Sequence, residues 1–115
     1  MYNPNKYNFN KMIEKGFNTI INMMEKFTDN VSESESSLGF NVEKVGDYLF
    51  NRQSASNQLW ASSPITGPSR FNIENNKWIH YKTKIPLNKF LENEIEKIND
   101  YNTKKNFLNI NDLKR

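Results

Sequence analysis

The first quarter of the chain carries apolar residues at every third or fourth position. Between residues 7 and 27 they are Phe9, Met12, Ile13, Phe17, Ile20, Met23, Met24 and Phe27. This spacing predicts an amphipathic helix over residues 7–27, with Gly16 as a mild weakness inside it. The methionine-rich stripe is typical of packing against a sheet, and a metal site built on thioether ligands is the alternative. Residues 1–6 are polar, and we expect them to be frayed.

The pattern changes to alternation in the middle of the chain, which is typical of half-buried strands. Short polar turns separate the alternating runs, so consecutive strands are expected to pair in an antiparallel sheet. The predicted strands cover residues 38–45, 48–53, 58–61, 70–73 and 78–82. Residues 32–37 are polar and acidic, and they form either a solvated edge strand or a loose loop.

A second helix is predicted around Pro86, because proline suits the first turn of a helix. Its apolar stripe is Leu87, Phe90, Leu91, Ile95 and Ile98, and its solvent-facing positions are Lys89, Glu92, Glu94, Glu96 and Lys97. The order helix, strands, helix predicts an α+β two-layer sandwich, with both helices on one face of an antiparallel sheet of about five to seven strands. The other face of the sheet is then open to solvent.

The length of 115 residues fits one domain over residues 1–115, with polar tails at residues 1–6 and about 100–115. The C-terminal tail either lies across a helix groove or is disordered, and both interpretations stay open. It contains the apolar residues Phe107, Leu108, Ile110 and Leu113.

Composition excludes several classes of protein. The chain has no cysteine, which excludes disulfides, thiolate nucleophiles and cysteine-based zinc sites. No apolar run approaches the roughly 18 to 20 residues that a membrane span needs, so we expect no membrane association. The net charge of +3 is mild and the lysines are scattered among acids. We therefore expect no nucleic-acid partner, although the basic pI and the aromatics keep a nucleic-acid-binding sheet as a weaker alternative.

Residues 48–71 contain no acidic residue, and one sheet face predicted there combines amides, one indole and one guanidinium. The candidate binding residues are Asn51, Gln53, Gln58, Trp60 and Arg70. Amides can donate and accept hydrogen bonds without the desolvation cost of a charge, and a guanidinium offers a planar fork for a carboxylate or phosphate. The stretch holds no nucleophile–base pair, so it is suited to docking and not to catalysis. The alternatives are an ordinary wet sheet face and a local salt bridge at Arg70.

Alternation in the strand at residues 58–61 places Leu59 and Ala61 on one face and Trp60 on the other. If Leu59 faces the helices, Trp60 faces solvent, and an exposed tryptophan is typical of a protein–protein contact. A core position for Trp60 is the alternative. We expect Trp78 to be core. His80 is the only histidine, and without nearby ligands at metal-binding spacing we interpret it as a packing or solvent-facing residue.

The order Asn51-Arg-Gln53, then Gln58-Leu-Trp-Ala-Ser-Ser-Pro64, then Thr66-Gly-Pro-Ser-Arg-Phe71 resembles the central signature of the frataxin family in its eukaryotic form. The match is close over residues 51–71 and looser over residues 7–99. The resemblance implies an accessory protein of iron–sulfur cluster assembly that docks on a cysteine desulfurase and the cluster scaffold protein and promotes sulfur transfer. The residues that match the family's docking surface are Asn51, Gln53, Gln58, Trp60 and Arg70.

The resemblance also implies an acidic ridge on the first helix and the adjoining edge strand that binds iron weakly through oxygen ligands. The candidate ligands are Glu14, Glu25, Asp29, Glu33, Glu35, Glu43 and Asp47. Lys15, Asn18, Asn22 and Lys26 stand where the family tends to place acids, so the ridge is thinned. The alternative function that the family suggests is a ferroxidase or iron-storage protein that oxidises Fe²⁺. The Glu-x-x-His spacing of di-iron oxidases is absent.

The resemblance to the eukaryotic type of the signature implies a mitochondrion or a related organelle, and a bacterial or cytosolic location is the alternative. The segment before the first helix is short and contains no arginine, so it lacks an ordinary transit peptide. A presequence is therefore missing from this chain, or the first helix itself acts as the signal. We expect a monomer with no tightly bound cofactor.

Overall fold

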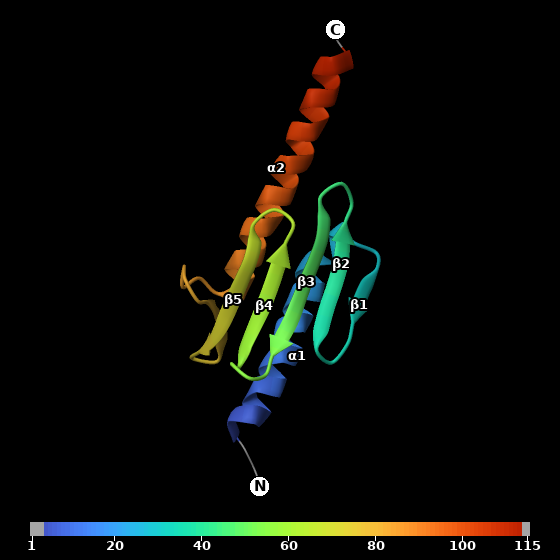
Figure 1. Cartoon of the computed structure of the whole chain (residues 1–115). Coiled ribbons are helices and arrows are strands. Elements are labelled where there is room, and N and C mark those ends of the chain that lie inside the picture. Colours follow the sequence, from blue (N-terminus) through green and yellow to red (C-terminus); the bar gives the residue numbers. More distant parts are fainter. Residues whose placement is uncertain (1–3, 114–115) are drawn as a thin grey trace.

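The computed structural model describes the backbone of residues 4–113 and the side chains of residues 8–103. Two long helices flank a run of six strands (Figure 1). The elements are α1 (Pro4–Met24), the short 3₁₀ helix η1 (Glu25–Phe27), β1 (Val31–Glu33), β2 (Ser37–Val42), β3 (Gly46–Gln53), β4 (Gln58–Ser63), β5 (Gly67–Glu74), β6 (Lys77–His80) and α2 (Leu87–Leu113).

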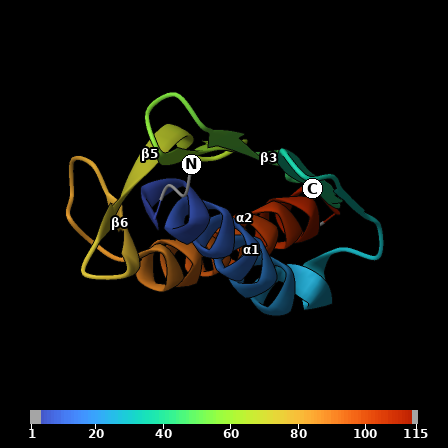
Figure 2. The same ribbon diagram turned by 90° about the horizontal axis from the view of Figure 1, so that it is seen from below.

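The strands form one antiparallel sheet in sequence order, from β1 at one edge to β6 at the other. Short turns join all the neighbours, and two of them use asparagines with positive φ, Asn57 before β4 and the pair Asn75 and Asn76 before β6. Asparagine tolerates this left-handed conformation better than most residues. Figure 2 shows both helices beneath the curved sheet, with the opposite face uncovered. The predicted α+β two-layer sandwich is confirmed.

The core lies between the helices and the inner face of the sheet. Phe40, Tyr48 and Phe50 stack across β2 and β3 with ring centroids 5.3 to 6.5 Å apart. Trp78 is buried, as predicted, and its indole N–H donates to the Met12 carbonyl at 2.7 Å. Gly16 makes this approach possible, because a Cβ at that position would lie 2.8 Å from the Trp78 Nε1 atom. The glycine that weakens the helix in sequence terms is thus a packing requirement of the fold.

The helix boundaries differ from the prediction at both ends of the chain. α1 begins at Pro4, so residues 4–6 are helical and not frayed, while residues 1–3 lie outside the described part. α2 continues past Asn99 to Leu113, and the expected tail is the last part of this helix (Figure 1). The side chains of Phe107, Leu108, Ile110 and Leu113 lie outside the described residues. The open question over residues 32–37 is settled by a three-residue edge strand, β1, followed by a turn.

Glu94 was predicted to face solvent, and this is wrong: it is 1% exposed. Its carboxylate accepts hydrogen bonds from the hydroxyl groups of Tyr48, Ser63 and Thr66, and the Tyr48 bond is 3.0 Å long. We refer to these four residues as the Glu94 cluster. Burial, with a smaller contribution from the nearby carboxylate, raises the pKa of Tyr48, so its phenol stays a donor. A buried carboxylate needs such partners to offset its lost hydration.

The Glu94 cluster fixes the turn between β4 and β5 to α2. Ser63 Oγ also accepts the backbone N–H groups of Ile65 and Thr66 at 3.1 and 3.0 Å. Lys97 Nζ lies 3.9 Å from the Glu94 carboxylate and donates to Thr66 Oγ1 at 3.3 Å. Sequence periodicity could not reveal this arrangement, because the three hydroxyl donors come from strands and a turn that are distant in the chain.

Candidate functional site

The five residues predicted to bind a partner all lie on β3, β4 and β5 and point to the open face. Strand register sets Asn51 opposite Trp60, and Trp60 opposite Arg70. Gln53 lies opposite Gln58 in the same ladder. Facing residues in adjacent antiparallel strands have Cβ atoms about 4.5 to 5.5 Å apart. The fold therefore gathers five side chains from twenty residues of sequence into one surface.

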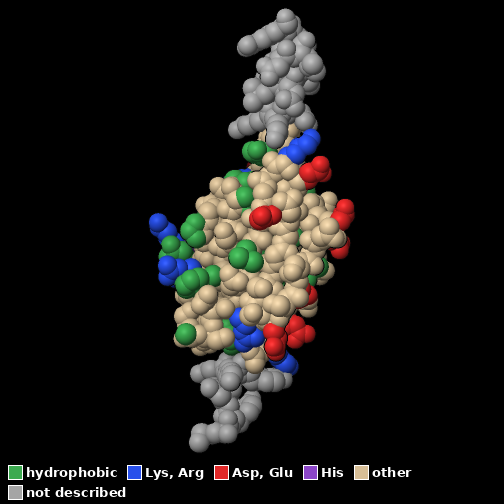
Figure 3. Space-filling model, turned by 45° about the vertical axis from the view of Figure 1, so that its right-hand side comes forward, with side chains coloured by type: hydrophobic (Ala, Val, Ile, Leu, Met, Phe, Trp, Pro, Cys, Tyr) green, Lys and Arg blue, Asp and Glu red, His purple; other side chains and the backbone are tan. Residues whose placement is uncertain are grey.

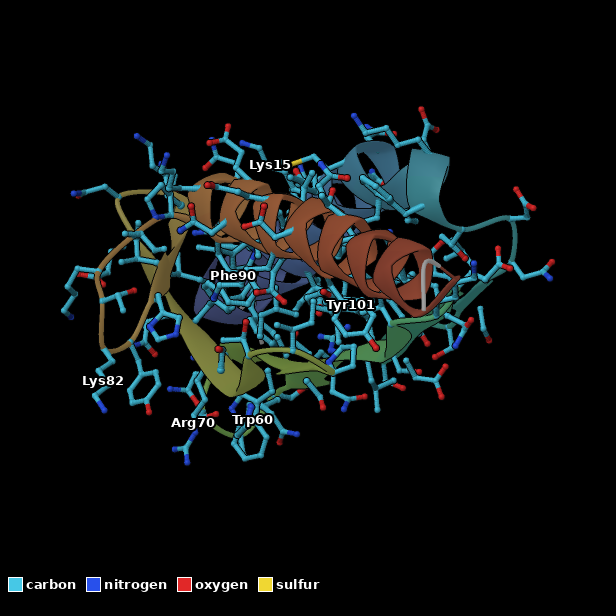
Figure 4. The ribbon with its side chains drawn as sticks, turned by 90° about the horizontal axis from the view of Figure 1, so that it is seen from above. Lys15, Trp60, Arg70, Lys82, Phe90 and Tyr101 are labelled. Atoms are coloured by element: carbon cyan, nitrogen blue, oxygen red, sulfur yellow. The ribbon has the colours of Figure 1, made fainter. Side chains whose placement is uncertain are left out.

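Trp60 lies on the open face, as predicted. It is 37% exposed, whereas its strand neighbours Leu59 and Ala61 are buried against the helices. Figure 4 shows Trp60 and Arg70 pointing away from the helices, on the opposite side of the sheet from Phe90. Because Leu59 packs inward, the pleat of β4 directs the indole to solvent.

Gln58 holds the indole in place. Its side-chain oxygen accepts the Trp60 indole N–H at 2.8 Å and the Ser56 hydroxyl at 3.1 Å. Its amide nitrogen donates to Asn72 Oδ1, also at 2.8 Å. The polar edge of Trp60 is thus satisfied within the protein, and the exposed part of the ring is left as apolar contact surface. Asn72 was missed by the sequence analysis, although it shares the outward parity of Arg70 on β5.

Arg70 stacks between two aromatic rings. Its guanidinium carbon lies 5.1 Å from the centroid of Trp60 and 5.7 Å from that of Tyr81. Tyr81 follows β6 directly, and its backbone N–H donates to the Arg70 carbonyl at 2.9 Å. Within the described side chains Arg70 forms no salt bridge. The local ion pair considered from the sequence is therefore not formed among these residues.

The uncovered surface extends beyond the predicted residues. Tyr81 is 44% exposed and Leu49 on β3 is 43% exposed. The sequence could have revealed both residues as outward-facing, because each continues the inward and outward alternation of its strand. We define the open-face patch as Leu49, Asn51, Gln53, Gln58, Trp60, Arg70 and Tyr81. It contains one cation and no acid.

His80 is a packing residue, in agreement with one of the two sequence interpretations. Its ring contacts Phe71, Tyr81 and Phe90, with centroids 5.2 to 6.2 Å away. Its Nδ1 atom accepts the backbone N–H groups of Lys82 and Thr83, both at 3.1 Å. Burial, and secondly the charge of Lys82, lower the pKa of His80. A neutral imidazole held in this way supports the loop that follows β6.

The predicted iron ligands are all exposed and are spread over several elements. They are Glu14 on α1, Glu25 on η1, Asp29 and Glu35 in loops, Glu33 on β1, Glu43 in the β2–β3 turn and Asp47 on β3. In Figure 3, which brings the β1 side forward, acidic side chains lie as separate groups and not as one patch. Within the part of the chain that the structure describes, no three acidic or histidine side chains form a group that could hold a metal ion.

Two of these acids do share a hollow. Asp29 and Glu43 line a depression of about 350 Å³ between η1 and the β2–β3 turn, together with Lys26 and Asn41. Asn41 also donates to the Asp47 carboxylate at 2.8 Å. The lysine lowers the negative potential of the hollow. The arrangement offers few oxygen ligands and is suited to weak cation binding only.

Comparison with known proteins identifies the family. A model of the frataxin-like domain matches residues 3–101. The chain belongs to the frataxin family. Mitochondrial frataxin of Arabidopsis thaliana is 32% identical over 99 residues, which cover 78% of this chain and 53% of that protein. Frataxin of Trachipleistophora hominis is 34% identical over 84 residues, covering 70% of this chain and 78% of that protein. The chain thus spans about half the length of the Arabidopsis frataxin.

Solved frataxin structures share the fold. Frataxin from Psychromonas ingrahamii superposes with a TM-score of 0.68 at 20% identity, covering 80% of this chain and 89% of that one. Trimeric frataxin from Saccharomyces cerevisiae superposes with a TM-score of 0.64 at 24% identity, covering 78% of this chain and 77% of that one. A further structure of the yeast trimer is described as a complex with ferrous iron. None of the described helices combines the length and apolar character that crossing a membrane requires.

Proposed function

We propose that this frataxin-family chain is an accessory protein of iron–sulfur cluster assembly. It docks through the open-face patch on a cysteine desulfurase and the cluster scaffold protein and promotes sulfur transfer between them. The observation that carries the proposal is Trp60, half-exposed and held by Gln58 beside Arg70 on a face that no helix covers. Tryptophan and arginine are the residues that most often dominate protein–protein contacts.

The patch supports binding and not chemistry. It contains no nucleophile–base pair and no acid, so an effect on a reaction must come from differential binding to the states of a larger complex. Asn51 and Gln53 make no side-chain hydrogen bond among the described residues, so their amides are available to the backbone of a partner. Gln58 also orients the indole, because its side-chain oxygen accepts the Trp60 N–H.

The partner-dependent reaction gives a direct test. Cysteine-dependent sulfide release by a desulfurase–scaffold mixture is measured with and without the protein, using wild type, Trp60→Ala and Tyr101→Ala. Tyr101 is a matched control, because it is 42% exposed and lies on α2 (Figure 4). We expect wild type and Tyr101→Ala to stimulate equally and Trp60→Ala to lose stimulation. Equal stimulation by all three proteins contradicts docking through Trp60.

We also propose weak Fe²⁺ binding at the hollow that contains Asp29 and Glu43. The iron complex of the yeast family member supports this, as do the oxygen ligands gathered there. Titration with Fe²⁺ under anaerobic conditions should broaden NMR signals of these two residues first, with few sites filled. In air, we expect Fe²⁺ to consume oxygen at the same rate with the protein present as in buffer alone. Faster uptake with the protein present favours the alternative function of a ferroxidase.

The relatives named as mitochondrial frataxins support a mitochondrion or a related organelle as the location of this protein. Imaging of the tagged protein together with a marker of that organelle tests this proposal. A diffuse cytosolic signal contradicts it.

A further inference from the structure

Tyr81 is not part of the sequence signature at residues 51–71, yet its ring contacts the Arg70 guanidinium. The β5–β6 ladder continues one step past β6 through the hydrogen bond from the Tyr81 N–H to the Arg70 carbonyl, 2.9 Å long. This bond places the phenol ring beside the guanidinium on the side opposite Trp60. The guanidinium is therefore covered on two sides by exposed rings, at 5.1 and 5.7 Å.

The position of Tyr81 is fixed from beneath. Its ring stacks on the His80 imidazole, with centroids 5.2 Å apart and an angle of 25° between the planes. His80 is itself held by the backbone N–H groups of Lys82 and Thr83 and by its contacts with Phe71 and Phe90. An exposed side chain supported in this way loses little conformational entropy when a partner binds.

The guanidinium keeps its hydrogen-bond donors free. Among the described residues Arg70 makes no side-chain hydrogen bond and no salt bridge, while its guanidinium lies over the Trp60 and Tyr81 rings. The Arg70 side chain points away from the helices (Figure 4), and its N–H donors fit the two oxygens of a carboxylate. A phosphate group is usually bound by several cations or by backbone N–H groups, and this patch has one guanidinium between aromatic rings.

We propose that Tyr81, together with Trp60, positions the Arg70 guanidinium within the open-face patch so that it binds one carboxylate side chain of the partner protein. This rests on the proposed docking function. Arg70 makes the contact with the partner and Tyr81 positions Arg70. The surface carries a cation and no acid, so an aspartate or glutamate bordered by apolar residues is its complement.

The test is the affinity of the protein for a desulfurase–scaffold complex, measured with Tyr81→Leu, Tyr81→Phe and Arg70→Lys. Tyr81→Leu keeps an apolar side chain but removes the aromatic face. We expect it to lower the affinity about fivefold or more, as for loss of a cation–π contact. Tyr81→Phe keeps the ring and should bind as wild type. Arg70→Lys keeps the charge without the fork and should weaken binding about tenfold.

Combining the Tyr81 and Arg70 substitutions shows whether Tyr81 positions Arg70 or contacts the partner independently. If Tyr81 acts through Arg70, Tyr81→Leu has little further effect in the Arg70→Lys background. Additive losses overturn the proposal, as does wild-type affinity of Tyr81→Leu. Phosphatase treatment of the partners should leave affinity unchanged, and weaker binding after treatment overturns the choice of a carboxylate.

Trp60→Ala is measured in parallel to separate the two proposals. If Trp60→Ala and all the other variants bind as wild type, docking through the patch itself fails. If Trp60→Ala weakens binding and Tyr81→Leu does not, only the role of Tyr81 fails. Thermal unfolding of each variant shows whether the fold is kept, and Tyr81→Phe retains the stack on His80.

Discussion

The two faces of the sheet use the same kinds of side chain in opposite ways. On the inner face Arg52 lies 5.0 Å from the Phe9 ring and donates to Asn10 and Ser54, so its charge is engaged within the protein. On the open face Arg70 stacks on Trp60 and Tyr81 but has no acceptor among the described residues. The comparison shows that strand parity separates residues that stabilise the fold from residues that remain available to a partner.

The same contrast holds for the acids. Glu94 is buried and accepts three hydroxyl hydrogen bonds, whereas the exposed acids of the β1 side have few partners. Substitutions on the inner face should therefore change the free energy of unfolding. Substitutions on the open face should change binding and affect stability less.

The largest effect is expected for Glu94→Ala, which leaves the hydroxyls of Tyr48, Ser63 and Thr66 without their acceptor. Loss of a buried, hydrogen-bonded charge typically costs about 3 kcal/mol or more. Urea denaturation should show this drop, while Glu92→Ala on the exposed side of α2 should change stability by less than about 0.5 kcal/mol. Equal effects of the two variants would mean that the Glu94 cluster contributes nothing specific.

Gly16→Ala tests the close approach of α1 to Trp78. Helix propensity alone favours alanine by about 1 kcal/mol. The new Cβ would lie 2.8 Å from the indole nitrogen that donates to the Met12 carbonyl, and overpacking of this kind costs about 1 to 3 kcal/mol. We expect a net loss of stability in thermal unfolding, and a gain for Asn18→Ala on the exposed side of α1. A more stable Gly16→Ala protein contradicts the packing requirement.

Much of the fold and of the open-face patch was predictable, because both follow from local periodicity. Alternation in β4 predicted that Leu59 faces the helices and Trp60 faces solvent, and the structure confirms both. Glu94 could not be placed, since its burial depends on hydroxyls that β3 and the β4–β5 turn bring to α2. Helix ends were also missed: polar composition at residues 100–113 favoured a tail, but the backbone there is helical.

Trp60→Ala should cost about 1 to 2 kcal/mol of stability, because the indole is 37% exposed and makes one hydrogen bond to Gln58 and a cation–π contact with Arg70. Loss of function without loss of fold would then separate the two faces. Chemical denaturation and a proton NMR spectrum check this. Leu59→Ala, one position away on the inner face, is the matched comparison and should cost about 2 to 5 kcal/mol. Similar losses for both variants would contradict the division between faces.

The smallest effect concerns pH and the only histidine of the chain. Burial lowers the pKa of His80 below its ordinary value of 6.5, so the unfolded chain takes up a proton at a pH where the folded protein does not. Stability is therefore fully present above about pH 6.5 and decreases as the pH falls from there toward the lowered pKa of the folded state. His80→Gln should remove the decrease between pH 7 and 5.5 in denaturation experiments, and an unchanged pH dependence in that variant would assign it to another group.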